Sequence, residues 1–382
     1  MTDISIVIPN YNGRELLPPL LDSIRNLDYP KDNIEIIIVD DASTDGFQSS
    51  IITDYPEARL IENKRNKRFV FTANRGAREA KGRYLLFLNN DTKANPDIIK
   101  ALLKTMESDP DCRSVGARML NWDGSHILFN GGYINFEGKG FEEGCSVDSP
   151  ESDNSRSEQL FSCGGAMLVD RVIFLDLGAF DEDYGMIYED VDFGWRLNLA
   201  GYKSLFSSDA IVYHHHHASL DAISYHLKAV YFERNSLQTI YKNLSDDNLG
   251  KILPAVLLLA SIRSQIFGEG ALKKIQPELS FFQSRAYNLI EKSLSIFGKD
   301  GISHLYAVNE FLTPGLKEKR KNIQKIRKVN DNKILKNNLF PNPFRIWAYN
   351  DDQYKYLSDG GYEKIWQDVI DIFDLKEIFI SS

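Results

Sequence analysis

The N-terminal quarter of the chain alternates short apolar runs with segments of helical period, and this alternation constrains the fold more than any other feature. Short apolar runs are typical of buried strands, whereas apolar residues spaced three and four apart are typical of helices. Strands that alternate with helices form a mostly parallel sheet covered on both faces, so we expect an α/β fold. The expected strands are residues 5–9, 34–39, 58–61 and 84–88, and the expected helices are residues 15–27, 47–55, 72–81 and 95–106.

The rest of the chain departs from this alternation. Residues 138–159 are rich in Gly, Ser, Asp and Glu, which is typical of a mobile loop and compatible with an active-site lid. Residues 189–200 have the pattern of a helix, and from residue 222 onward the pattern is mainly helical. We therefore expect a first domain at residues 1–244 and a mainly helical C-terminal extension at residues 245–382.

Composition limits the class of protein and its location. The chain has 382 residues, of which 43% are hydrophobic and 26% charged, as in a soluble globular protein, and its net charge of −9 disfavours nucleic acid as the main partner. No signal peptide is visible, and the most apolar stretch, residues 252–262, is too short to span a bilayer, so we interpret it as a core helix, with shallow membrane contact as the alternative. The cysteines lack metal-site spacing and indicate reduced thiols in the cytoplasm: Cys112, Cys145 and Cys163.

A basic run in the C-terminal region contrasts with the acidic balance of the whole chain. Residues 317–336 contain nine lysines or arginines against two acidic residues, Glu318 and Asp331. Such a run is usually the solvated face of a helix. The alternative is attraction to an anionic membrane surface or an anionic acceptor, with the protein peripheral at the inner face of the membrane.

Polar residues follow three of the expected strands, at the point where each strand ends. The first strand ends in PNYNG (residues 9–13), the second in Asp40-Asp41, and the fourth in NNDT (residues 89–92). A lone Asp-Asp turn is usually structural, because Asp favours turns. In open parallel sheets, however, ligands bind at the carboxyl ends of the strands. Three polar strand ends that meet at one edge therefore predict a functional site.

The phosphate-binding motifs of common nucleotide-binding folds do not occur in this sequence. The first strand is not followed by G-x-G-x-x-G, and G-x-x-x-x-G-K-[ST] is absent. A phosphate group must be held in another way, and a divalent cation is the obvious means. Asp91, at a strand end, offers the hard oxygen that Mg²⁺ and Mn²⁺ prefer, so we expect one of these ions as the cofactor.

Six motifs occur in a fixed order within about residues 3–240: SIVIPNYNG, VDDASTDG, YLLFLNNDT, GGAMLVDR, GAFDEDYGMIYEDVDFGWRLNLAGYK and VYHHHHAS. In this order they resemble the inverting glycosyltransferases of family 2, above all the rhamnosyltransferase-like bacterial members that act on polysaccharides or lipid-linked glycans. Any one motif is weak, but six in order are specific. The resemblance implies a GT-A type nucleotide-sugar-binding fold.

The resemblance also implies a nucleotide site at the strand ends. In the family, the positions of Pro9, Tyr11 and Asp41 receive the base and ribose, and a carboxylate there can accept a hydrogen bond from the imide N–H of the base. The D-x-D metal motif corresponds to Asn89-Asn90-Asp91, where Asn89 removes one charge. We expect weaker metal affinity, with Asp91 as the main carboxylate ligand. The implied nucleotide-binding residues are Pro9, Tyr11, Asp40, Asp41, Asn74 and Asn90.

Three carboxylates crowd the start of the helix expected at residues 189–200: Glu189, Asp190 and Asp192. Capping of the helix dipole explains one or two acidic residues there, but not three. Helical spacing lets Asp192 pair with Arg196 and directs Asp190 toward the sheet. In the family the aspartate of the Glu-Asp pair is the general base, so we assign that role to Asp190, with Glu189 as the second candidate.

Two further groups complete the implied site. In the family a histidine five residues before a serine helps to bind the metal, and counting back from Ser219 gives His214, with His216 in reserve. Lys67 and Arg68 replace smaller residues and face either the diphosphate or water. The acceptor side is implied to include Gly164, Gly165 and Trp195, although core packing is the alternative for Trp195 and for Trp122.

The resemblance implies an inverting glycosyltransferase that uses a nucleotide-diphosphate sugar, with a dTDP- or UDP-linked donor and rhamnose as the first choice. The expected partners are this donor and a glycan or lipid-linked saccharide acceptor; the C-terminal region leaves membrane contact or a homodimer open. One alternative is a sugar-phosphate nucleotidylyltransferase, but the glycine- and arginine-rich loop that it needs after the first strand is missing. The other is a catalytically silent scaffold, against which the intact Asp41, Asp91 and Asp190 argue.

Overall fold

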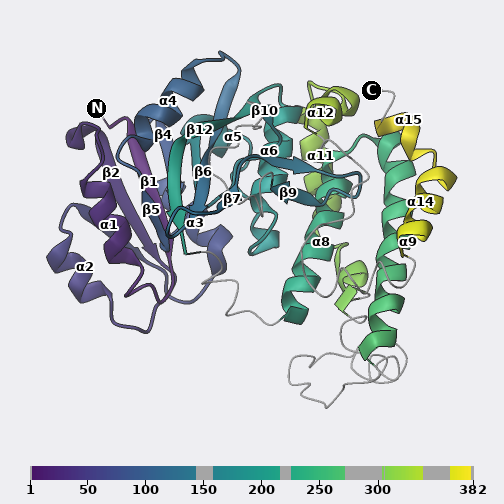
Figure 1. The fold of residues 1–382 in the computed structure, drawn as a ribbon, viewed down its shortest axis with the longest axis horizontal. Coiled ribbons are helices and arrows are strands. Elements are labelled where there is room, and N and C mark those ends of the chain that lie inside the picture. Colours follow the sequence, from purple (N-terminus) through teal and green to yellow (C-terminus); the bar gives the residue numbers. More distant parts are fainter. Residues whose placement is uncertain are drawn as a thin grey trace. The chain divides into compact units, whose positions relative to one another are not determined.

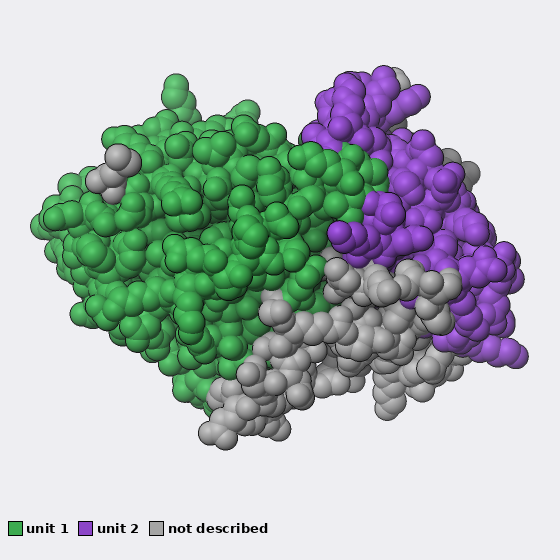
Figure 2. Space-filling model, turned by 90° about the horizontal axis from the view of Figure 1, so that it is seen from above, with its two compact units in different colours: residues 1–133, 140–218, 327–329 green, residues 134–139, 219–326, 330–382 purple. Residues whose placement is uncertain are grey.

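The structure is a computed structural model that describes residues 2–142, 158–215, 225–271, 303–304, 306–338 and 362–379. The chain divides into two compact units (Figure 1, Figure 2). Unit 1 comprises residues 1–133, 140–218 and 327–329, and unit 2 comprises residues 134–139, 219–326 and 330–382. Most of the predicted loop at residues 138–159 lies outside the described residues, as do Cys145, His216 and Ser219.

Unit 1 is built on one large mixed sheet with the strand order β10-β12-β6-β11-β4-β1-β2-β3. Strand β5 pairs with β12 and β7 with β6, while β8 and β9 form a separate pair. The strands are β1 (Ile4–Asn10), β2 (Ile34–Asp40), β3 (Ala58–Glu62), β4 (Tyr84–Leu88), β5 (Thr92–Ala94), β6 (Cys112–Asn121), β7 (Ile127–Phe129), β8 (Gly132–Ile134), β9 (Gly140–Glu142), β10 (Glu158–Gln159), β11 (Ala166–Asp170) and β12 (Lys203–His214).

The parallel part of this sheet is the part that the sequence pattern predicted. Strands β4, β1, β2 and β3 are parallel neighbours, and β12 also runs parallel to β6. Strand β11 lies antiparallel between β4 and β6. The apolar runs are fully enclosed, since residues 6–8 of β1 and 85–88 of β4 are 0% exposed. The predicted α/β fold with its parallel central strands is confirmed, with antiparallel pairs added around β11.

The helices of unit 1 pack on the sheet, and all but the short helix at residues 171–176 lie close to predicted positions. They are α1 (Leu17–Arg25), α2 (Gln48–Asp54), α3 (Arg68–Glu79), α4 (Ile98–Glu107), α5 (Arg171–Asp176) and α6 (Glu189–Leu199). Helix α3 packs on β1 and β2, and α4 packs on β6 and β12. The first turn of α3 precedes the predicted start at residue 72, because the Asp41 carboxylate accepts the backbone N–H groups of Lys67 and Arg68 and so caps this end of the helix.

Unit 2 is helical, which confirms the predicted character of the C-terminal region. Its helices are α8 (Tyr225–Asn243), α9 (Asp246–Ala271), α11 (Leu316–Ile326), α12 (Asp331–Asn338), α14 (Tyr362–Ile372) and α15 (Leu375–Phe379). Helix α8 packs with α9 and α11, and α14 and α15, drawn in yellow, lie beside α9 (Figure 1). The apolar stretch of α9 contributes Ile252, Val256 and Leu259 to the core. Among the described helices, none combines the length and apolar character needed to cross a membrane.

The compact units do not coincide with the predicted division at residue 244. Helix α8 belongs to unit 2 because it packs with α9 and α11. Residues 134–139, which connect β8 to β9, also belong to unit 2. Where the boundary between independently folding domains lies stays a prediction.

Candidate active site

The carboxyl ends of β1, β2 and β4 are joined by hydrogen bonds, as expected from a parallel sheet. Asn10 and Asp40 are partners in the register of β1 and β2, and the N–H of Asp41 donates to the carbonyl oxygen of Asn10 at 2.8 Å. The end of β4 is joined by Asn90, whose side-chain N–H donates to Asn10 Oδ1 at 2.8 Å. The three polar strand ends that the sequence singled out therefore lie together.

Asn10 is a residue to which the sequence analysis gave no role. Its side chain is 2% exposed, and its Nδ2 has no hydrogen-bond partner among the described residues. A buried amide group without a partner is costly, so such a donor at a strand end is a candidate contact for a bound ligand. The signal in the sequence was its place in PNYNG, which does not separate it from its neighbours.

The loops that follow β1 and β2 are tied to each other beside these strand ends. The N–H of Asn12 donates to Ser43 Oγ at 2.8 Å, and the N–H of Thr44 donates to Asn12 Oδ1 at 2.9 Å. Asp40 accepts hydrogen bonds from the backbone and side chain of Ser43. Tyr11 extends from this region with 49% of its surface exposed, whereas Pro9 is buried in β1. Of the predicted base and ribose contacts, Tyr11 is thus the accessible one.

Asp41 is already well supplied with hydrogen-bond donors. Its carboxylate is 3% exposed and accepts from the backbone N–H groups of Lys67 and Arg68 and from the side chain of Asn63 at 2.8 Å. These bonds fix the loop before α3. Asp41 therefore has a structural function as a helix cap, and a contact from this residue to a nucleotide base stays a prediction.

Asn74 and the basic pair beside α3 also have local roles. Asn74 is 0% exposed and exchanges hydrogen bonds with the backbone of Phe180, at 2.8 Å as donor and 3.0 Å as acceptor. It fastens α3 to the segment before α6, and its predicted nucleotide contact stays untested. The side chains of Lys67 and Arg68 are exposed, and the Lys67 ammonium lies 5.3 Å from the centre of the Phe71 ring.

Asp91 and His214 meet because β5, which follows the NNDT motif, pairs antiparallel with the end of β12. His214 Nε2 lies 3.0 Å from Asp91 Oδ1, and Asp91 is 3% exposed. Burial raises the pKa of the Asp91 carboxyl, but the hydrogen bond and positive charge of His214 outweigh it, so the pKa is lower than usual.

The Asp91–His214 pair has the chemistry of a metal site. Two neighbouring ligands of an octahedral ion with bonds of about 2.1 Å are about 3.0 Å apart, so the pair fits such an ion as well as it fits a hydrogen bond. Within the part of the chain that the structure describes, no group of three or more His, Cys, Asp or Glu side chains is arranged to hold a metal. A cation here would therefore need ligands from a bound diphosphate or from water in addition to these two side chains.

The Glu189–Asp190 pair lies in the first turn of α6. Asp190 Oδ2 accepts a hydrogen bond from the N–H of Gly164 at 3.0 Å, and Oδ1 accepts from the N–H of Val191 at 2.8 Å. Glu189 is 7% exposed, and its Oε2 has no hydrogen-bond partner among the described residues. Burial raises the pKa of both carboxyl groups, and the charge of Asp190 raises the pKa of Glu189 further. Such a pair favours one shared proton near neutral pH.

The backbone before this pair is held in an unusual conformation. Ile187 and Tyr188 both have positive φ angles, 66° and 78°, which cost roughly 1–2 kcal/mol per residue for side chains with a Cβ. The third acidic residue of the turn, Asp192, is 0% exposed and forms the predicted ion pair with Arg196 at 2.8 Å. Asp190 differs from Asp192 in its partners, because among the described residues its carboxylate accepts hydrogen bonds from the backbone N–H groups of Gly164 and Val191.

The glycine pair at residues 164–165 connects Asp190 to the metal-motif strand. The N–H of Asn89 donates to the carbonyl oxygen of Gly165 at 3.0 Å. A Cβ on Gly165 would lie 2.7 Å from the Asn89 side chain and would displace it, whereas a Cβ on Gly164 would approach atoms of Glu189 and Asp190 no closer than 3.6 Å. Trp195 is 1% exposed, which favours core packing over contact with an acceptor sugar, and the Trp122 ring stacks on His215 with centroids 3.7 Å apart.

Comparisons with known proteins agree with this arrangement. Residues 5–163 match the family described as "Glycosyl transferase family 2". The chain is 28% identical over 226 residues to the O-antigen biosynthesis protein RfbC of Myxococcus xanthus, which covers 56% of this chain and 17% of that protein. It is 28% identical over 230 residues to the N-acetylglucosaminyl-diphospho-decaprenol L-rhamnosyltransferase of Mycobacterium tuberculosis, which covers 52% of this chain and 73% of that protein.

A solved structure of GalNAc-T7 with UDP, GalNAc and Mn²⁺ has a similar fold. The TM-score is 0.52 at 15% sequence identity, and the match covers 81% of this chain and 56% of that one. This likeness agrees with the GT-A type fold that the motifs implied. The match of residues 5–163 and the two bacterial relatives support the family 2 glycosyltransferase that the motifs predicted, and the solved structure supports the fold alone.

Proposed function

We propose that the protein transfers a sugar from a nucleoside-diphosphate donor to a hydroxyl group of a glycan or lipid-linked saccharide, with inversion at the anomeric carbon. One observation carries this proposal: a chain of hydrogen bonds through Gly164-Gly165 and Asn89 links Asp190 to the Asp91–His214 pair. A proton acceptor and a cation-binding pair are therefore held on one small framework. In-line displacement needs these two groups on opposite sides of the reacting carbon.

Asp190 acts as the general base in this proposal. It accepts the proton of the acceptor hydroxyl while the new bond to the anomeric carbon forms and the bond to the diphosphate oxygen breaks. The N–H groups of Gly164 and Val191 orient its carboxylate and favour the ionised form. Glu189, the more buried of the two neighbouring carboxyl groups, keeps the proton that the pair shares, which leaves Asp190 ionised to act as the base.

A divalent cation, when bound, would offset the negative charge that develops on the departing diphosphate. Asp91 and His214 would hold the ion on the protein side. Their 3.0 Å separation supports this assignment, and the structure of similar fold named above was solved with Mn²⁺. At the predicted nucleotide site, the buried Asn10 Nδ2 has no hydrogen-bond partner among the described residues, and the Tyr11 ring is exposed. Both groups are therefore candidate contacts for the nucleotide.

The names of the two bacterial relatives guide the choice of donor and acceptor to test. The Mycobacterium tuberculosis relative is by name a rhamnosyltransferase that uses a lipid-linked sugar acceptor, and the Myxococcus xanthus relative is an O-antigen biosynthesis protein. We therefore take dTDP-rhamnose as the first donor to test and UDP-linked N-acetylhexosamines as the second. The acceptor class is a saccharide of a surface polysaccharide or its lipid-linked precursor.

Nucleotide binding can be tested without knowing the acceptor. Nucleoside diphosphates (dTDP, UDP and GDP) with Mn²⁺ are expected to raise the melting temperature of the wild-type protein. A ligand at about a hundred times its Kd adds roughly 2.7 kcal/mol, or about 5–10 °C for a unit of this size. The base that gives the largest shift identifies the donor class. Differential scanning fluorimetry with and without Mn²⁺ provides the measurement.

Two variants sharpen this test. Asp91→Ala is expected to abolish the part of the shift that depends on Mn²⁺, because it removes the carboxylate of the metal pair. Asp123→Ala removes an exposed carboxylate of the turn before β7 and is expected to leave the shift unchanged. A full Mn²⁺-dependent shift in Asp91→Ala would show that the metal pair is wrongly assigned.

We also propose that helix α11 attracts the protein to anionic membranes. Lys317, Lys321 and Lys325 recur every four residues along α11 and are exposed, whereas Arg320 is 8% exposed and turned inward. Each lysine near an anionic surface adds about 1 kcal/mol of attraction, so replacing all three with Gln is expected to weaken binding to phosphatidylglycerol vesicles roughly a hundredfold.

Vesicle co-sedimentation at low and high salt measures this effect. The matched control replaces three exposed lysines of unit 1, Lys64, Lys81 and Lys104, with Gln. If both triple variants bind alike, or if the wild-type protein binds phosphatidylcholine vesicles equally well, α11 is simply a solvated helix face.

A further inference from the structure

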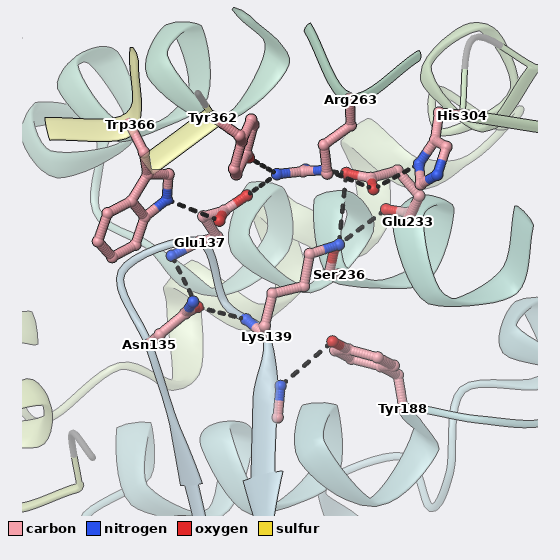
Figure 3. A network of polar contacts seen from close by, with 11 residues as sticks. Asn135, Glu137, Lys139, Tyr188, Glu233, Ser236, Arg263, His304, Tyr362 and Trp366 are labelled. Carbon is pink, nitrogen blue, oxygen red and sulfur yellow. Dashed lines mark hydrogen bonds and ion pairs between the residues drawn. The ribbon is translucent and has the colours of Figure 1, made fainter. Parts of the chain in front are cut away.

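A cluster of charged side chains is buried inside unit 2 (Figure 3). Glu137, Lys139, Glu233 and Arg263 are each between 2% and 7% exposed. Arg263 lies between the two glutamates and donates to Glu137 at 2.7 Å and to Glu233 at 2.6 Å. Lys139 Nζ lies 3.3 Å from Glu233 Oε1. Four further side chains bind these charged groups. Trp366 donates a hydrogen bond to Glu137, and His304 lies 3.0 Å from Glu233. Lys139 donates to the hydroxyl of Ser236, and Arg263 donates to the hydroxyl of Tyr362.

This cluster fixes a turn as well as a set of helices. Buried charges are tolerated only where each one is paired in a defined geometry, so the positions of all members depend on one another. Glu233 and Arg263 come from α8 and α9, but Glu137 and Lys139 come from the turn between β8 and β9. The charge cluster, meaning Glu137, Lys139, Glu233 and Arg263, therefore fastens that turn to the helices of unit 2.

The turn itself has little freedom. Asn135 Oδ1 accepts the backbone N–H groups of both Glu137 and Lys139, at 3.0 and 2.9 Å. Gly138 has φ 70°, and a Cβ there would lie 2.3 Å from a methyl carbon of Ile240 on α8. Only glycine suits this position, both for its backbone conformation and for its close approach to the helix. The positions of Glu137 and Lys139 thus determine where the chain leaves the turn.

The residue that follows the turn contacts the segment carrying the proposed base. Gly140 donates its N–H to the hydroxyl oxygen of Tyr188 at 3.2 Å (Figure 3). Tyr188 is 4% exposed, has φ 78°, and directly precedes Glu189 and Asp190. A tyrosine persists in the left-handed region only where its surroundings hold it there. The bond from Gly140 is one of these restraints.

We propose that the charge cluster of unit 2 positions the Glu189–Asp190 pair through the Lys139–Gly140 peptide and Tyr188. Glu137 and Tyr188 are then positioning residues for the transfer reaction. The inference rests on the proposed function for the role of Asp190. Its physical content, a linkage from residue 137 to residue 188, is independent of any substrate.

Hydrogen exchange tests this linkage on the full-length protein without a ligand. Glu137→Gln keeps the shape of the side chain but removes its charge opposite Arg263. We expect amide exchange in a peptide covering residues 186–192 to become roughly tenfold faster, because the restraint on Tyr188 is loosened. The peptide containing residue 137 should change as well. Should Glu137→Gln fail to fold, Tyr362→Phe loosens Arg263 by removing a single hydroxyl group.

The matched control is Arg320→Lys in α11. This buried guanidinium binds the carbonyl oxygens of Tyr241 and Leu244 at the end of α8 and lies outside the charge cluster. It should increase exchange at the end of α8 and leave residues 186–192 unchanged. If exchange at residues 186–192 is unchanged in Glu137→Gln and in Tyr362→Phe, or rises equally in Arg320→Lys, the inference is wrong.

Kinetics provide the second test. Tyr188→Phe removes only the hydroxyl that accepts from Gly140, and a misplaced base is expected to lower kcat roughly 10–100-fold with the KM for the donor within about twofold. The assay is release of nucleoside diphosphate from whichever of dTDP-rhamnose and UDP-N-acetylglucosamine the wild-type protein consumes. The acidic limb of the kcat profile should move to higher pH, since weaker bonds from Gly164 and Val191 raise the pKa of Asp190 beside Glu189.

The double variant Glu137→Gln/Tyr188→Phe separates linkage from general damage. If both changes break one linkage, the double variant is no slower than the slower single variant. Losses that multiply would overturn the inference. A wild-type protein that consumes neither donor counts against the proposed function, while the exchange experiment still decides the linkage. If Tyr188→Phe has normal kcat while Asp190→Asn is inactive, the inference is wrong and the proposed function still holds.

Discussion

Replacing Asp190 with Asn is expected to lower kcat by a factor of about 10²–10⁴ and to leave the affinity for nucleoside diphosphate and Mn²⁺ nearly unchanged. The amide oxygen of Asn can still accept the hydrogen bonds that Gly164 and Val191 donate, so the site keeps its shape. What is lost is the carboxylate that we propose takes a proton from the acceptor hydroxyl. Initial rates with saturating donor, together with calorimetric titration of the nucleotide, measure the two quantities separately.

The matched control for this prediction lies two residues away on the same helix. Asp192→Asn breaks the buried ion pair with Arg196 and should lower the melting temperature, yet it should keep kcat within a few-fold of wild type because Asp192 holds Arg196 and not the substrate. Near-normal turnover in Asp190→Asn would mean that Asp190 is not the base, and that either Glu189 or a residue outside the pair has this role.

The largest effect on stability is expected for Arg263→Met. This change removes the cation between Glu137 and Glu233 and leaves both carboxylates buried without the guanidinium that pairs with each of them. Removing one partner of a buried ion pair typically costs about 3–5 kcal/mol. We expect the transition that unfolds unit 2 to shift by that amount in urea titrations followed by circular dichroism.

A surface pair provides the comparison for Arg263→Met. The side chains of Arg78 and Glu182 are 53% and 40% exposed, so Arg78→Met should change the unfolding free energy by less than about 1 kcal/mol. Equal costs for the two variants would mean that the buried cluster contributes no more than an exposed ion pair.

Lowering the pH should destabilise unit 2 through the same charge cluster. Burial alone would raise the pKa of Glu233, but Arg263, Lys139 and His304 together hold it well below the usual value. A carboxyl whose pKa is lowered on folding adds stability above its unfolded pKa of about 4.3, and this contribution is lost as the pH falls toward the folded value. Wild-type unit 2 should therefore lose stability below about pH 5, and Arg263→Met should show a weaker dependence over that range.

The parallel strands and their polar ends could be predicted from the sequence, because both depend on local patterns. Apolar runs such as residues 84–88 have the length of a buried strand, and the residues that follow them are polar at the carboxyl edge of the sheet. The pairing of Asp192 with Arg196 followed from helical spacing alone. Each of these features is encoded within about ten residues.

The features that the sequence did not indicate depend on distant partners. Strand β6 (Cys112–Asn121) was not predicted because Arg113, Gly116 and Arg118 interrupt its apolar pattern, although it is an interior strand between β12 and β11. Asp41 caps α3 through Lys67 and Arg68, which follow it by 26 and 27 positions in the sequence. The charge cluster could not be predicted for the same reason, since isolated charged residues are usually exposed and its members are scattered from residue 137 to residue 263.

The helical unit also takes six of its residues from a point in the chain far upstream of the rest. During synthesis Glu137 and Lys139 leave the ribosome well before α8 and α9. The charged side chains of this turn therefore cannot pair with Glu233 and Arg263 until the C-terminal half has been synthesised. Family members that exchange C-terminal halves, by recombination or in engineered chimeras, would have to exchange the β8–β9 turn together with them.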